Sequence, residues 1–204
     1  MRRYERKYRI EGMSFAEVSA IVRQHPLAFR EEYPMRTVRN LYLDTPELDC
    51  FVDNLHGVQH RVKYRLRWYG EEAIPDGPVN LELKRKDADI GSKQTYRQST
   101  INPERLDTPE TLPLLYPSLR NHYRRAYFRS FNGLYRLTID FDLQFQPPQL
   151  TIPHSPGTHD PAIIVELKYD VKQDLRYYEV GQFLPFRASK NSKYVTGMLL
   201  VGAT

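Results

Sequence analysis

Apolar and polar residues alternate along eight stretches of the chain, which are separated by segments rich in turn residues. A period of two sends successive side chains to opposite faces of a strand, so the pattern predicts eight β-strands. They cover residues 3–10, 38–44, 61–69, 81–86, 95–101, 123–131, 134–143 and 163–169. No regular alternation of strand and helix links them. The chain is therefore predicted to be a mainly β, α+β protein built on an antiparallel sheet or barrel.

Short helices are predicted beside these strands. Ser14 and Glu17 form the pair of a capping box, and Phe15, Val18 and Val22 recur on one side of the helix that it begins. Further helical spacings cover residues 46–55, 175–183 and 191–201. Because these helices are few and short, we expect them to flank the sheet.

The clearest turn signal is the pair Asn132 and Gly133 between two alternating runs. Both residue types tolerate a positive φ, so the pair predicts a type I′ hairpin turn that fixes the register of the two strands. That register pairs Phe131 with Leu134, Arg129 with Arg136, Tyr127 with Thr138 and Arg125 with Asp140. One face of the hairpin is then charged, and the other is mostly apolar.

Length and composition limit the class of protein. A chain of 204 residues is long enough to bury a core without disulfides, and residues 1–204 are predicted to form one domain. The single cysteine, Cys50, excludes a disulfide framework and a Cys-rich zinc site. The sequence shows neither a signal peptide nor a run of about 18 apolar residues. We therefore expect a cytoplasmic protein without a transmembrane segment of its own.

Basic residues exceed acidic ones. The chain has 30 Lys and Arg against 25 Asp and Glu, which gives a net charge of +5 and a pI near 9.2. This excess favours an anionic partner, such as nucleic acid, anionic lipid or a phosphate compound. The positions of the charges along the strands decide among these.

The charges are sorted onto one face of each predicted strand. Lys63, Arg65 and Arg67 share a face, and apolar or aromatic residues occupy the other face of the same strand. The same division places on charged faces Glu5 with Lys7, Glu82 with Lys84, Arg136 with Asp140 and Asp142, and Glu166 with Lys168. One such face is typical of a half-buried sheet that meets water. Several faces with stacked like charges, such as Arg129 opposite Arg136, would repel unless an anion lay between them.

An eight-stranded antiparallel barrel with these faces inward would form a tunnel with a charged lumen, and its apolar faces would lie under the short helices. Phosphate suits such a lumen, because arginine offers forked donors and lysine a point charge. A carboxylate such as Glu166 can hold Mg²⁺ or Mn²⁺ that bridges phosphates. Single-stranded nucleic acid is the rival ligand. Aromatic residues such as Tyr64 and Trp68 alternate with the cations and point away from them, so no nucleic acid is expected.

Seven short segments resemble a known family. They are ERKY (5–8), VKYRLRWYG (62–70), LELK (81–84), YRRAYF (123–128), RLTIDFD (136–142), VELK (165–168) and SKNSKY (189–194), and LYLDT (41–45) adds to them. In this order and on these strands, they resemble the VTC domain, the polyphosphate polymerase domain of the CYTH-like triphosphate tunnel superfamily. The likeness spans nearly the whole chain.

The resemblance implies a tunnel in which the γ-phosphate of ATP is moved onto an inorganic polyphosphate chain, with Mn²⁺ or Mg²⁺ bound. By matching motif, the phosphate ligands would be Lys7, Arg65, Arg67, Lys84, Arg125, Arg136, Lys190 and Lys193, with hydrogen bonds from Tyr123 and Ser192, and the metal ligand would be Glu166. Face positions add Lys63 on the phosphate, and Glu5 and Asp142 on the metal. VTC domains elsewhere work beside membrane segments, so tethering here would need a membrane-protein partner.

One position departs from the superfamily pattern. Hydrolytic members begin with a Glu-x-Glu-x-Lys strand, and this chain has Arg3, Glu5 and Lys7 at those positions. Loss of a carboxylate weakens a two-metal hydrolytic site, which favours the polymerase. A metal-dependent tripolyphosphatase and a non-catalytic polyphosphate or inositol-phosphate binding module stay open as alternatives.

Overall fold

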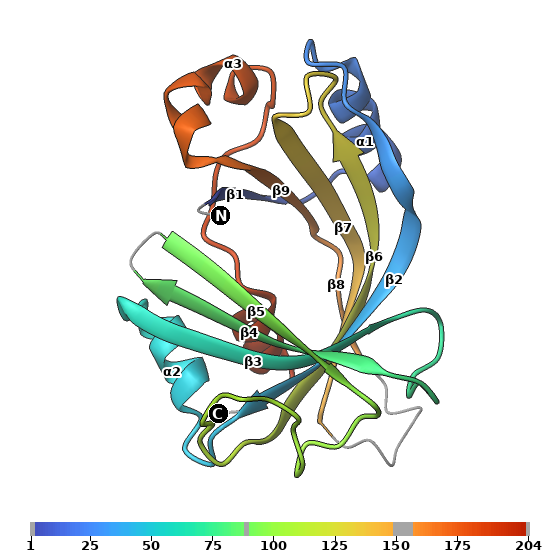
Figure 1. Cartoon of the computed structure of the whole chain (residues 1–204). Coiled ribbons are helices and arrows are strands. Elements are labelled where there is room, and N and C mark those ends of the chain that lie inside the picture. Colours follow the sequence, from blue (N-terminus) through green and yellow to red (C-terminus); the bar gives the residue numbers. More distant parts are fainter. Residues whose placement is uncertain (1–2, 88–89, 149–156, 203–204) are drawn as a thin grey trace. The chain divides into compact units, whose positions relative to one another are not determined.

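The computed structural model describes residues 3–87, 90–148 and 157–202 (Figure 1). Its strands are β1 (Arg3–Ile10), β2 (Arg30–Asp44), β3 (His60–Tyr69), β4 (Val79–Asp87), β5 (Ile90–Gln98), β6 (Tyr116–Arg129), β7 (Tyr135–Gln146), β8 (Thr158–Asp160) and β9 (Ile163–Asp170). Its helices are α1 (Phe15–Gln24), α2 (Asp49–His56), the 3₁₀ helix η1 (Val171–Arg176), α3 (Tyr178–Gly181) and α4 (Lys193–Leu200). None of these helices has the length and apolarity needed to cross a membrane.

The strands form one nine-stranded sheet. Their order is β1-β9-β7-β6-β2-β3-β4-β5, and β8 pairs with β7. The pairs β1–β9, β2–β3, β3–β4, β4–β5 and β7–β9 are antiparallel. The predicted mainly β, antiparallel fold with short helices is confirmed.

Several strands correct the sequence-based boundaries. Strands β5 and β6 begin at Ile90 and Tyr116 rather than at residues 95 and 123. The sheet has a ninth strand, β8, which is three residues long and too short to show alternation. Strand β2 begins at Arg30, well before the predicted start at residue 38. Its first half is mostly exposed, so it has no buried apolar face that a period of two could reveal. Part of the segment between β7 and β8, residues 149–156, lies outside the described residues.

The hairpin between β6 and β7 keeps the predicted register but not the predicted turn. The Ser130 amide donates to the Tyr135 carbonyl at 3.0 Å, which agrees with the expected pairing. The Gly133 amide donates to the Ser130 carbonyl at 2.8 Å, and Gly133 has a φ of +71°. The described non-glycine residues with positive φ do not include Asn132, so the turn is not type I′. Instead, the Asn132 Oδ1 atom accepts from the Leu134 amide at 3.1 Å and holds the loop.

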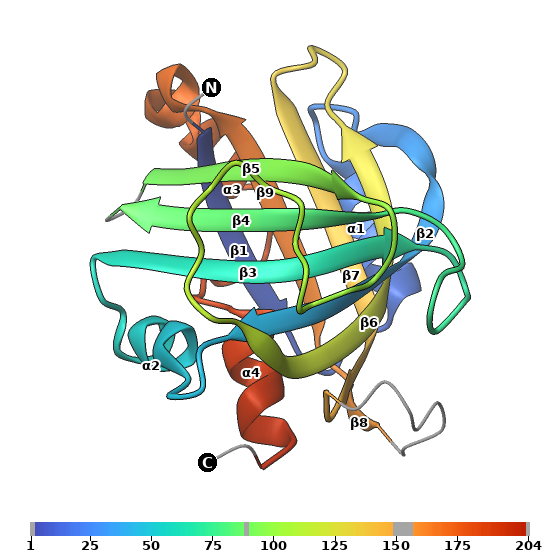
Figure 2. The same ribbon diagram turned by 60° about the horizontal axis from the view of Figure 1, so that its bottom comes forward.

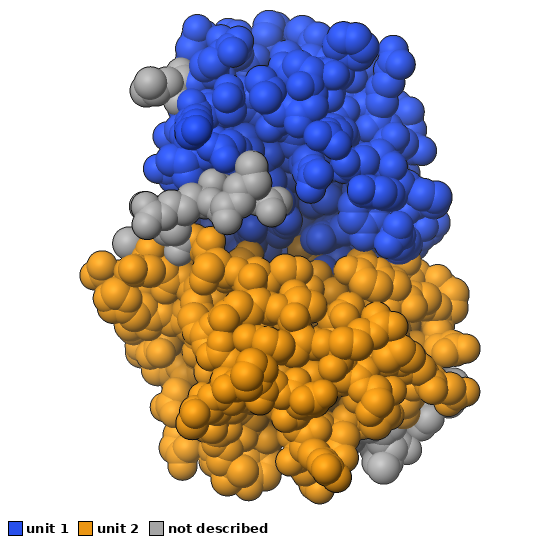
Figure 3. Space-filling model, in the orientation of Figure 1, with its two compact units in different colours: residues 1–36, 123–143, 160–191 blue, residues 37–122, 144–159, 192–204 orange. Residues whose placement is uncertain are grey.

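The chain divides into two compact units (Figure 3). Unit 1 contains residues 1–36, 123–143 and 160–191, and unit 2 contains residues 37–122, 144–159 and 192–204. Strands β2, β6, β7 and β8 therefore contribute residues to both units. The assignment of residues 1–204 to one domain stays a prediction.

The core of unit 1 lies under α1, beside β6 and β7 in Figure 1. The predicted capping box is confirmed, because the Glu17 amide donates to Ser14 Oγ at 3.3 Å and the Ser14 amide donates to Glu17 Oε2 at 2.7 Å. Val18 and Val22 of this helix are fully buried. They belong to a cluster with Tyr8, Ile10, Phe29, Ala126, Phe128, Tyr135, Leu137, Ile139, Phe141, Ile163, Val165, Leu167, Tyr169, Val180 and Leu184. The apolar faces of β1, β6, β7 and β9 are thus covered, as the alternation predicts.

In unit 2, one buried carboxylate joins two helices. Asp44, at the end of β2, accepts from the Cys50 amide at 2.8 Å and from the Phe51 amide at 2.9 Å. These amides lie in the first turn of α2, where main-chain donors have no partner within the helix. The hydroxyl of Tyr194 in α4 donates to the same carboxylate at 2.5 Å, and its ring stacks on Tyr42 with 4.8 Å between centroids. Asp44 therefore anchors both α2 and α4 to the end of β2.

Candidate functional site

The charged face of unit 2 follows from the register of β3, β4 and β5, which lie side by side (Figure 2). Lys63 pairs with Lys84, and Lys84 pairs with Lys93. Three ammonium groups therefore occupy one row across the sheet, although like charges directly opposite one another destabilise a sheet. In the next row, Arg65 pairs with Glu82.

Glu82 is the centre of this face. It is 3% exposed, and its Oε2 atom accepts from Arg65 Nη2 at 2.6 Å and from Arg65 Nε at 2.8 Å. Lys93 Nζ donates to Oε1 at 2.8 Å, and Arg67 Nη1 lies 3.4 Å from Oε2. Burial alone would raise the pKa of Glu82, but Arg65, Arg67 and Lys93 outweigh burial and hold the pKa well below its usual range. Glu82 is therefore ionised and keeps these cations in place.

The balance of charge on this face is strongly positive. Over the described residues of β3, β4 and β5, the register places eight cations and one carboxylate on it: Arg61, Lys63, Arg65, Arg67, Lys84, Lys86, Lys93 and Arg97, and Glu82. Such an excess on one face raises the local concentration of anions and favours their binding. A ligand with several negative charges, such as a phosphate chain, matches it best.

The start of α4 lies against this face within unit 2. Lys63 Nζ donates to Ser192 Oγ at 2.7 Å, and the Val195 amide donates to the same oxygen at 3.3 Å. Ser192 is the N-cap of α4, and Lys193 is its first residue. The structure thus brings together two predicted phosphate-binding residues that are far apart in the sequence, Lys63 of β3 and Ser192 at the start of α4.

The charged face of unit 1 has a different pattern. In the β1–β9 register, Glu5 pairs with Lys168, and Lys7 pairs with Glu166. Lys7 Nζ lies 3.2 Å from Glu5 Oε1 and 3.4 Å from Glu166 Oε1, and Lys168 Nζ donates to Glu166 Oε2 at 2.8 Å. Burial would lower the pKa of Lys7, but Glu166 and Glu5 outweigh burial and raise it. Cations and carboxylates alternate here in both directions.

Arg125 and Asp140 add a buried ion pair to unit 1. Arg125 Nε and Nη2 donate to the two Asp140 oxygens at 2.5 and 2.7 Å, as the hairpin register predicts. Asp140 is fully buried, and Arg125 is 9% exposed. The Arg125 guanidinium also lies 3.7 Å from Glu166 Oε2 and 5.4 Å from the centre of the Tyr123 ring. The Arg125 guanidinium thus brings together three predicted site residues, Arg125, Tyr123 and Glu166, and also contacts Asp140.

Arg129 and Arg136 are screened by a residue that the sequence analysis missed. Arg129 Nη1 lies 3.2 Å and Arg136 Nη2 lies 3.8 Å from Glu32 Oε1. Opposite one another in the predicted register, the two arginines were expected to need an external anion. Glu32 supplies a negative charge from the first half of β2, outside the predicted strand. The repulsion between these two arginines is therefore not by itself a sign of a ligand.

The comparison of the sequence with protein families decides the relationship. The family model described as the VTC domain matches residues 2–111 and 110–201, which together span nearly the whole chain. The chain belongs to the VTC domain family. No curated protein matches the sequence.

Solved structures share the fold of this VTC domain. One is a proposed adenylate cyclase from Vibrio parahaemolyticus, with 15% identity, a TM-score of 0.55 and coverage of 96% of this chain and 98% of that chain. Another is a proposed adenylyl cyclase from Hippeastrum with a dominant triphosphatase activity, at 17% identity, a TM-score of 0.53 and coverage of 98% and 96%. At this identity the likeness shows the fold alone. It agrees with the CYTH-like triphosphate tunnel fold that the sequence motifs predict.

Of the three predicted metal ligands of the VTC domain, two converge and one does not. The Oε1 atoms of Glu5 and Glu166 both lie within 3.4 Å of Lys7 Nζ. Asp142 has a φ of +53°, which interrupts the alternation of β7, and its carboxylate is 57% exposed and 3.8 Å from Arg124 Nη1. Thr138 is the partner of Glu166, and Asp142 follows it by four residues, or about 13 Å along a strand. Asp142 is therefore not part of a site with Glu5 and Glu166.

The donors of Glu5 and Glu166 suit a hard divalent cation. Among the described residues, no three His, Cys, Asp or Glu side chains gather in a way that could hold a metal ion. Mg²⁺ in phosphate-handling enzymes is commonly bound by one or two carboxylates together with phosphate oxygens and water. Two carboxylates thus fit a metal whose remaining ligands come from the substrate, and they do not fit a metal caged by protein alone.

The segment that carries Lys190 runs beside β1 in unit 1. The Ser189 amide donates to the Lys7 carbonyl at 2.8 Å, and Lys7 Nζ donates to the Asn191 carbonyl at 3.0 Å. Lys190 lies between these anchored residues, and its side chain is exposed. Residues 189–192 of the motif SKNSKY are therefore an extended segment rather than part of a helix, and α4 begins only at Lys193.

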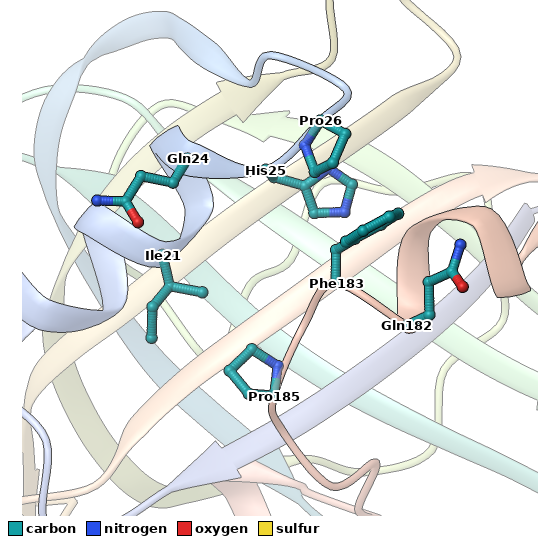
Figure 4. Close-up of a pocket in the computed structure, with 7 residues that line it drawn as sticks. All are labelled: Ile21, Gln24, His25, Pro26, Gln182, Phe183 and Pro185. Carbon is teal, nitrogen blue, oxygen red and sulfur yellow. The ribbon is translucent and has the colours of Figure 1, made fainter.

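A cavity of about 350 Å³ in unit 1 has no Lys, Arg, Asp or Glu in its lining (Figure 4). It is lined by Ile21, Gln24, His25, Pro26, Gln182, Phe183 and Pro185. His25 Nε2 lies 3.0 Å from the Val180 carbonyl, and its Nδ1 atom accepts from the Leu27 amide at 3.0 Å. Because Nδ1 accepts a hydrogen bond, it carries no proton, and burial lowers the pKa of His25 in the same sense. The ring therefore has a structural role. With no Lys or Arg in its lining, this cavity does not suit phosphate.

Two further groups of unit 2 were missed by the sequence analysis. Lys93 contacts Glu82, but the predicted strand began only at residue 95. Asn40 and Asn121 connect to Arg67 through hydrogen bonds, and no motif distinguishes them in the sequence. The register of an edge strand and the partners of an amide are properties of the tertiary structure, so a single sequence carries little signal for them.

Proposed function

We propose that this VTC domain is a phosphotransferase that moves the γ-phosphate of ATP onto an inorganic polyphosphate chain. The observation that carries the proposal is the excess of cations on the face of β3, β4 and β5, with eight cations and one carboxylate over the described residues of these strands. Phosphoryl transfer is catalysed mainly by positioning and by neutralising the charge of the transferred group, so it needs no nucleophile on the protein. Membership of the VTC family supports polymerisation as the reaction.

In this proposal, Arg65 and Arg67 bind phosphate oxygens with forked donors, and Lys63, Lys84 and Lys93 neutralise the chain along its length. Glu82 holds the guanidinium of Arg65 and the ammonium of Lys93 at 2.6 to 2.8 Å, so these donors are already in place before the ligand arrives. Preorganised donors lower the barrier because little reorganisation is needed during the reaction.

The charged residues of unit 1 have separate proposed roles. Arg125 and Arg136 are proposed phosphate ligands, and Lys7, Tyr123 and Lys190 are further proposed contacts in unit 1. Lys193, which belongs to unit 2, is another. Glu5 and Glu166 are the proposed ligands of Mg²⁺ or Mn²⁺, and the bound metal would supply charge neutralisation at the phosphate oxygens. Lys7 lies between these two carboxylates, so it limits their repulsion when no metal is bound.

A metal-dependent tripolyphosphatase is the second candidate. The Hippeastrum structure with the same fold has a dominant triphosphatase activity, which supports hydrolysis as an alternative outcome of the same chemistry. The sequence argues against it, because Arg3 occupies the position of a carboxylate in hydrolytic members.

Three measurements on the purified protein separate the candidates. Incubation with ATP and Mn²⁺ or Mg²⁺ should yield polyphosphate that lengthens with time on a gel. Release of free phosphate from tripolyphosphate without chain growth would instead identify a hydrolase. Tight binding of tripolyphosphate with neither product would identify a binding module. Arg65→Ala is the matched control, since it should abolish each of these signals if the face of β3, β4 and β5 is the site.

A further inference from the structure

A chain of hydrogen bonds in unit 2 begins at Arg67 and ends at an amide without a partner. Arg67 Nε donates to Asn40 Oδ1 at 2.8 Å, and Asn40 Nδ2 donates to Asn121 Oδ1 at 2.7 Å. A guanidinium only donates, so it fixes which atom of the Asn40 amide is the oxygen, and Asn40 in turn fixes Asn121. Among the described residues, the Asn121 Nδ2 atom is buried and has no hydrogen-bond partner.

The Asn121 Nδ2 donor therefore lacks an acceptor among the described residues. Asn121 is 3% exposed, so bulk water does not reach it freely. A buried donor without a partner destabilises the fold, because it has lost the hydrogen bond that it would make to water. An acceptor atom supplied from outside the chain would remove that cost.

Asn121 lines a cavity of about 20 Å³. This volume holds about one atom the size of a water oxygen. The other lining residues are Arg39, Asn40, Trp68, Ala73, Arg120, His122 and Gln146. All of them belong to unit 2, and they lie apart from the row of Lys63, Lys84 and Lys93.

Two arginines of this cavity are anchored to the main chain. Arg39 Nε donates to the Gly70 carbonyl at 3.0 Å and Nη2 to the Glu71 carbonyl at 2.8 Å. Arg120 Nε donates to the Pro147 carbonyl at 3.2 Å, and Arg120 is 5% exposed. Main-chain carbonyls thus hold both guanidinium groups in place, and the charge of Glu71 also acts on Arg39.

The positive potential of these groups is visible at His122. Burial, then Arg39 and, more weakly, Arg120 lower the pKa of His122 to about 4, whereas Glu71 acts in the opposite direction. Burial, followed by the charge of Arg39, also lowers the pKa of Arg120. The cavity therefore combines donors, positive charge and an amide with no partner, which is the environment that an anionic oxygen requires.

We propose that this cavity is a second anion site, which takes one oxygen of a phosphate group. Asn121 and the two anchored arginines donate to that oxygen, and the rest of the phosphate stays at the mouth because the cavity holds only one such atom. Inorganic phosphate and the terminal phosphate of a polyphosphate chain share this chemistry. The proposal does not depend on the phosphotransferase function.

The test follows the ring signals of His122 by nuclear magnetic resonance across pH. Inorganic phosphate should raise the pKa of His122 by about one unit or more, because an opposite charge then lies nearby. Sodium chloride at the same ionic strength is the control, and tripolyphosphate tests the terminal phosphate of a chain. His122→Asn assigns the signal among the six histidines.

Variants locate the effect. Asn121→Asp and Arg120→Gln should abolish the phosphate-dependent shift, and Arg39→Gln replaces either variant that fails to fold. Arg105→Gln, which removes a charge from an exposed position, should leave the shift intact. Arg65→Ala should also leave it intact, which separates this site from the face of β3, β4 and β5. The proposal is overturned by an equal shift in chloride, by no shift in phosphate, or by loss of the shift in Arg65→Ala.

Discussion

The charged faces of the two units arise from the same alternation in the sequence but differ in their balance of charge. In unit 1, Lys7 and Lys168 each lie near Glu5 and Glu166, Arg125 is paired with Asp140, and Arg129 and Arg136 share Glu32. On β3, β4 and β5 of unit 2, eight cations face one carboxylate, Glu82, over the described residues of these strands. Alternation alone does not distinguish these two cases.

The difference in charge balance predicts which residues contribute mainly to stability and which contribute mainly to binding. A cation that is already paired with a buried carboxylate contributes mainly to the fold, because removing it leaves a buried charge without its partner. Arg65, Arg67 and Lys93 share one buried carboxylate, Glu82, so their positive charge exceeds its negative charge and contributes mainly to anion binding. Loss of one of them still leaves Glu82 with the other two. We therefore expect substitutions in unit 1 to reduce the free energy of unfolding most, and substitutions on the face of unit 2 to reduce affinity for phosphate chains most.

The largest effect is expected from Arg125→Ala in unit 1. Asp140 is fully buried and would lose both hydrogen bonds from the guanidinium, so the free energy of unfolding should fall by about 3–5 kcal/mol. Urea denaturation followed by circular dichroism measures it. Arg124→Ala is the matched control, because the ion pair of Arg124 with Asp142 is exposed and long. The Arg124 side chain is 53% exposed, and its Nη1 atom lies 3.8 Å from the Asp142 carboxylate. Equal losses in the two variants would contradict the view that unit 1 is stabilised by its buried ion pairs.

Arg65→Ala should produce the next largest effect, on binding. Loss of a charge-assisted contact should weaken tripolyphosphate binding by about 1.5–3 kcal/mol, measured by calorimetry. Lys168→Ala in unit 1 is the control, because Lys168 is already paired with Glu166 at 2.8 Å. If Lys168→Ala weakened binding as much as Arg65→Ala, the contrast between the two faces would be wrong.

Glu82→Gln should have opposite effects on stability and on binding. Removing the negative charge leaves Arg65, Arg67 and Lys93 to repel one another, so the free energy of unfolding should fall by roughly 1–2 kcal/mol, less than for a fully buried pair, because Lys93 is 49% exposed. The same change frees these donors for phosphate. Tripolyphosphate should therefore raise the melting temperature more in Glu82→Gln than in the unchanged protein. A smaller rise would show that Glu82 organises the cations more than it competes for them.

The last prediction concerns the dependence of stability on pH. The pKa of His122 is lowered from 6.5 to about 4 in the folded protein, so between these values the unfolded chain binds more protons. His122 therefore does not reduce the free energy of unfolding above pH 6.5. As the pH falls from 6.5 toward 4, protonation of His122 in the unfolded chain lowers this free energy. Glu82 acts in the same direction at lower pH, because its pKa is also lowered. His122→Asn should flatten the pH dependence of the unfolding free energy in this window, and an unchanged slope would exclude His122 as its source.

Most of the sheet could be predicted from the sequence, because its strands have one apolar face that packs under helices. The exceptions are segments without one apolar and one polar face. The first half of β6 is buried on both faces at residues 118–121, which include Arg120 and Asn121, so it shows no alternation. The first half of β2 is largely exposed, and β8 has three residues, so neither shows a period of two. The first half of β2 matters for the site, because it carries Glu32, whose carboxylate lies near both Arg129 and Arg136.

The candidate site was predictable only as far as strand faces extend. Arg65, Arg67 and Glu82 come together as their spacing and register imply. Asp142 does not join Glu5 and Glu166, because a positive φ at Asp142 interrupts the alternation of β7. A single residue with an unusual backbone conformation gives no signal in a hydropathy pattern, and neither does the partner of an asparagine amide.

Asp44 has a consequence for the order in which the chain can fold during synthesis. Its carboxylate needs the amides of Cys50 and Phe51, which emerge soon after it, and the hydroxyl of Tyr194, which emerges about 150 residues later. When the chain has been synthesised only as far as residue 122, α2 can be capped but α4 is absent. Until α4 is synthesised, the Asp44 carboxylate and the Tyr42 ring at the end of β2 therefore lack their contacts with Tyr194.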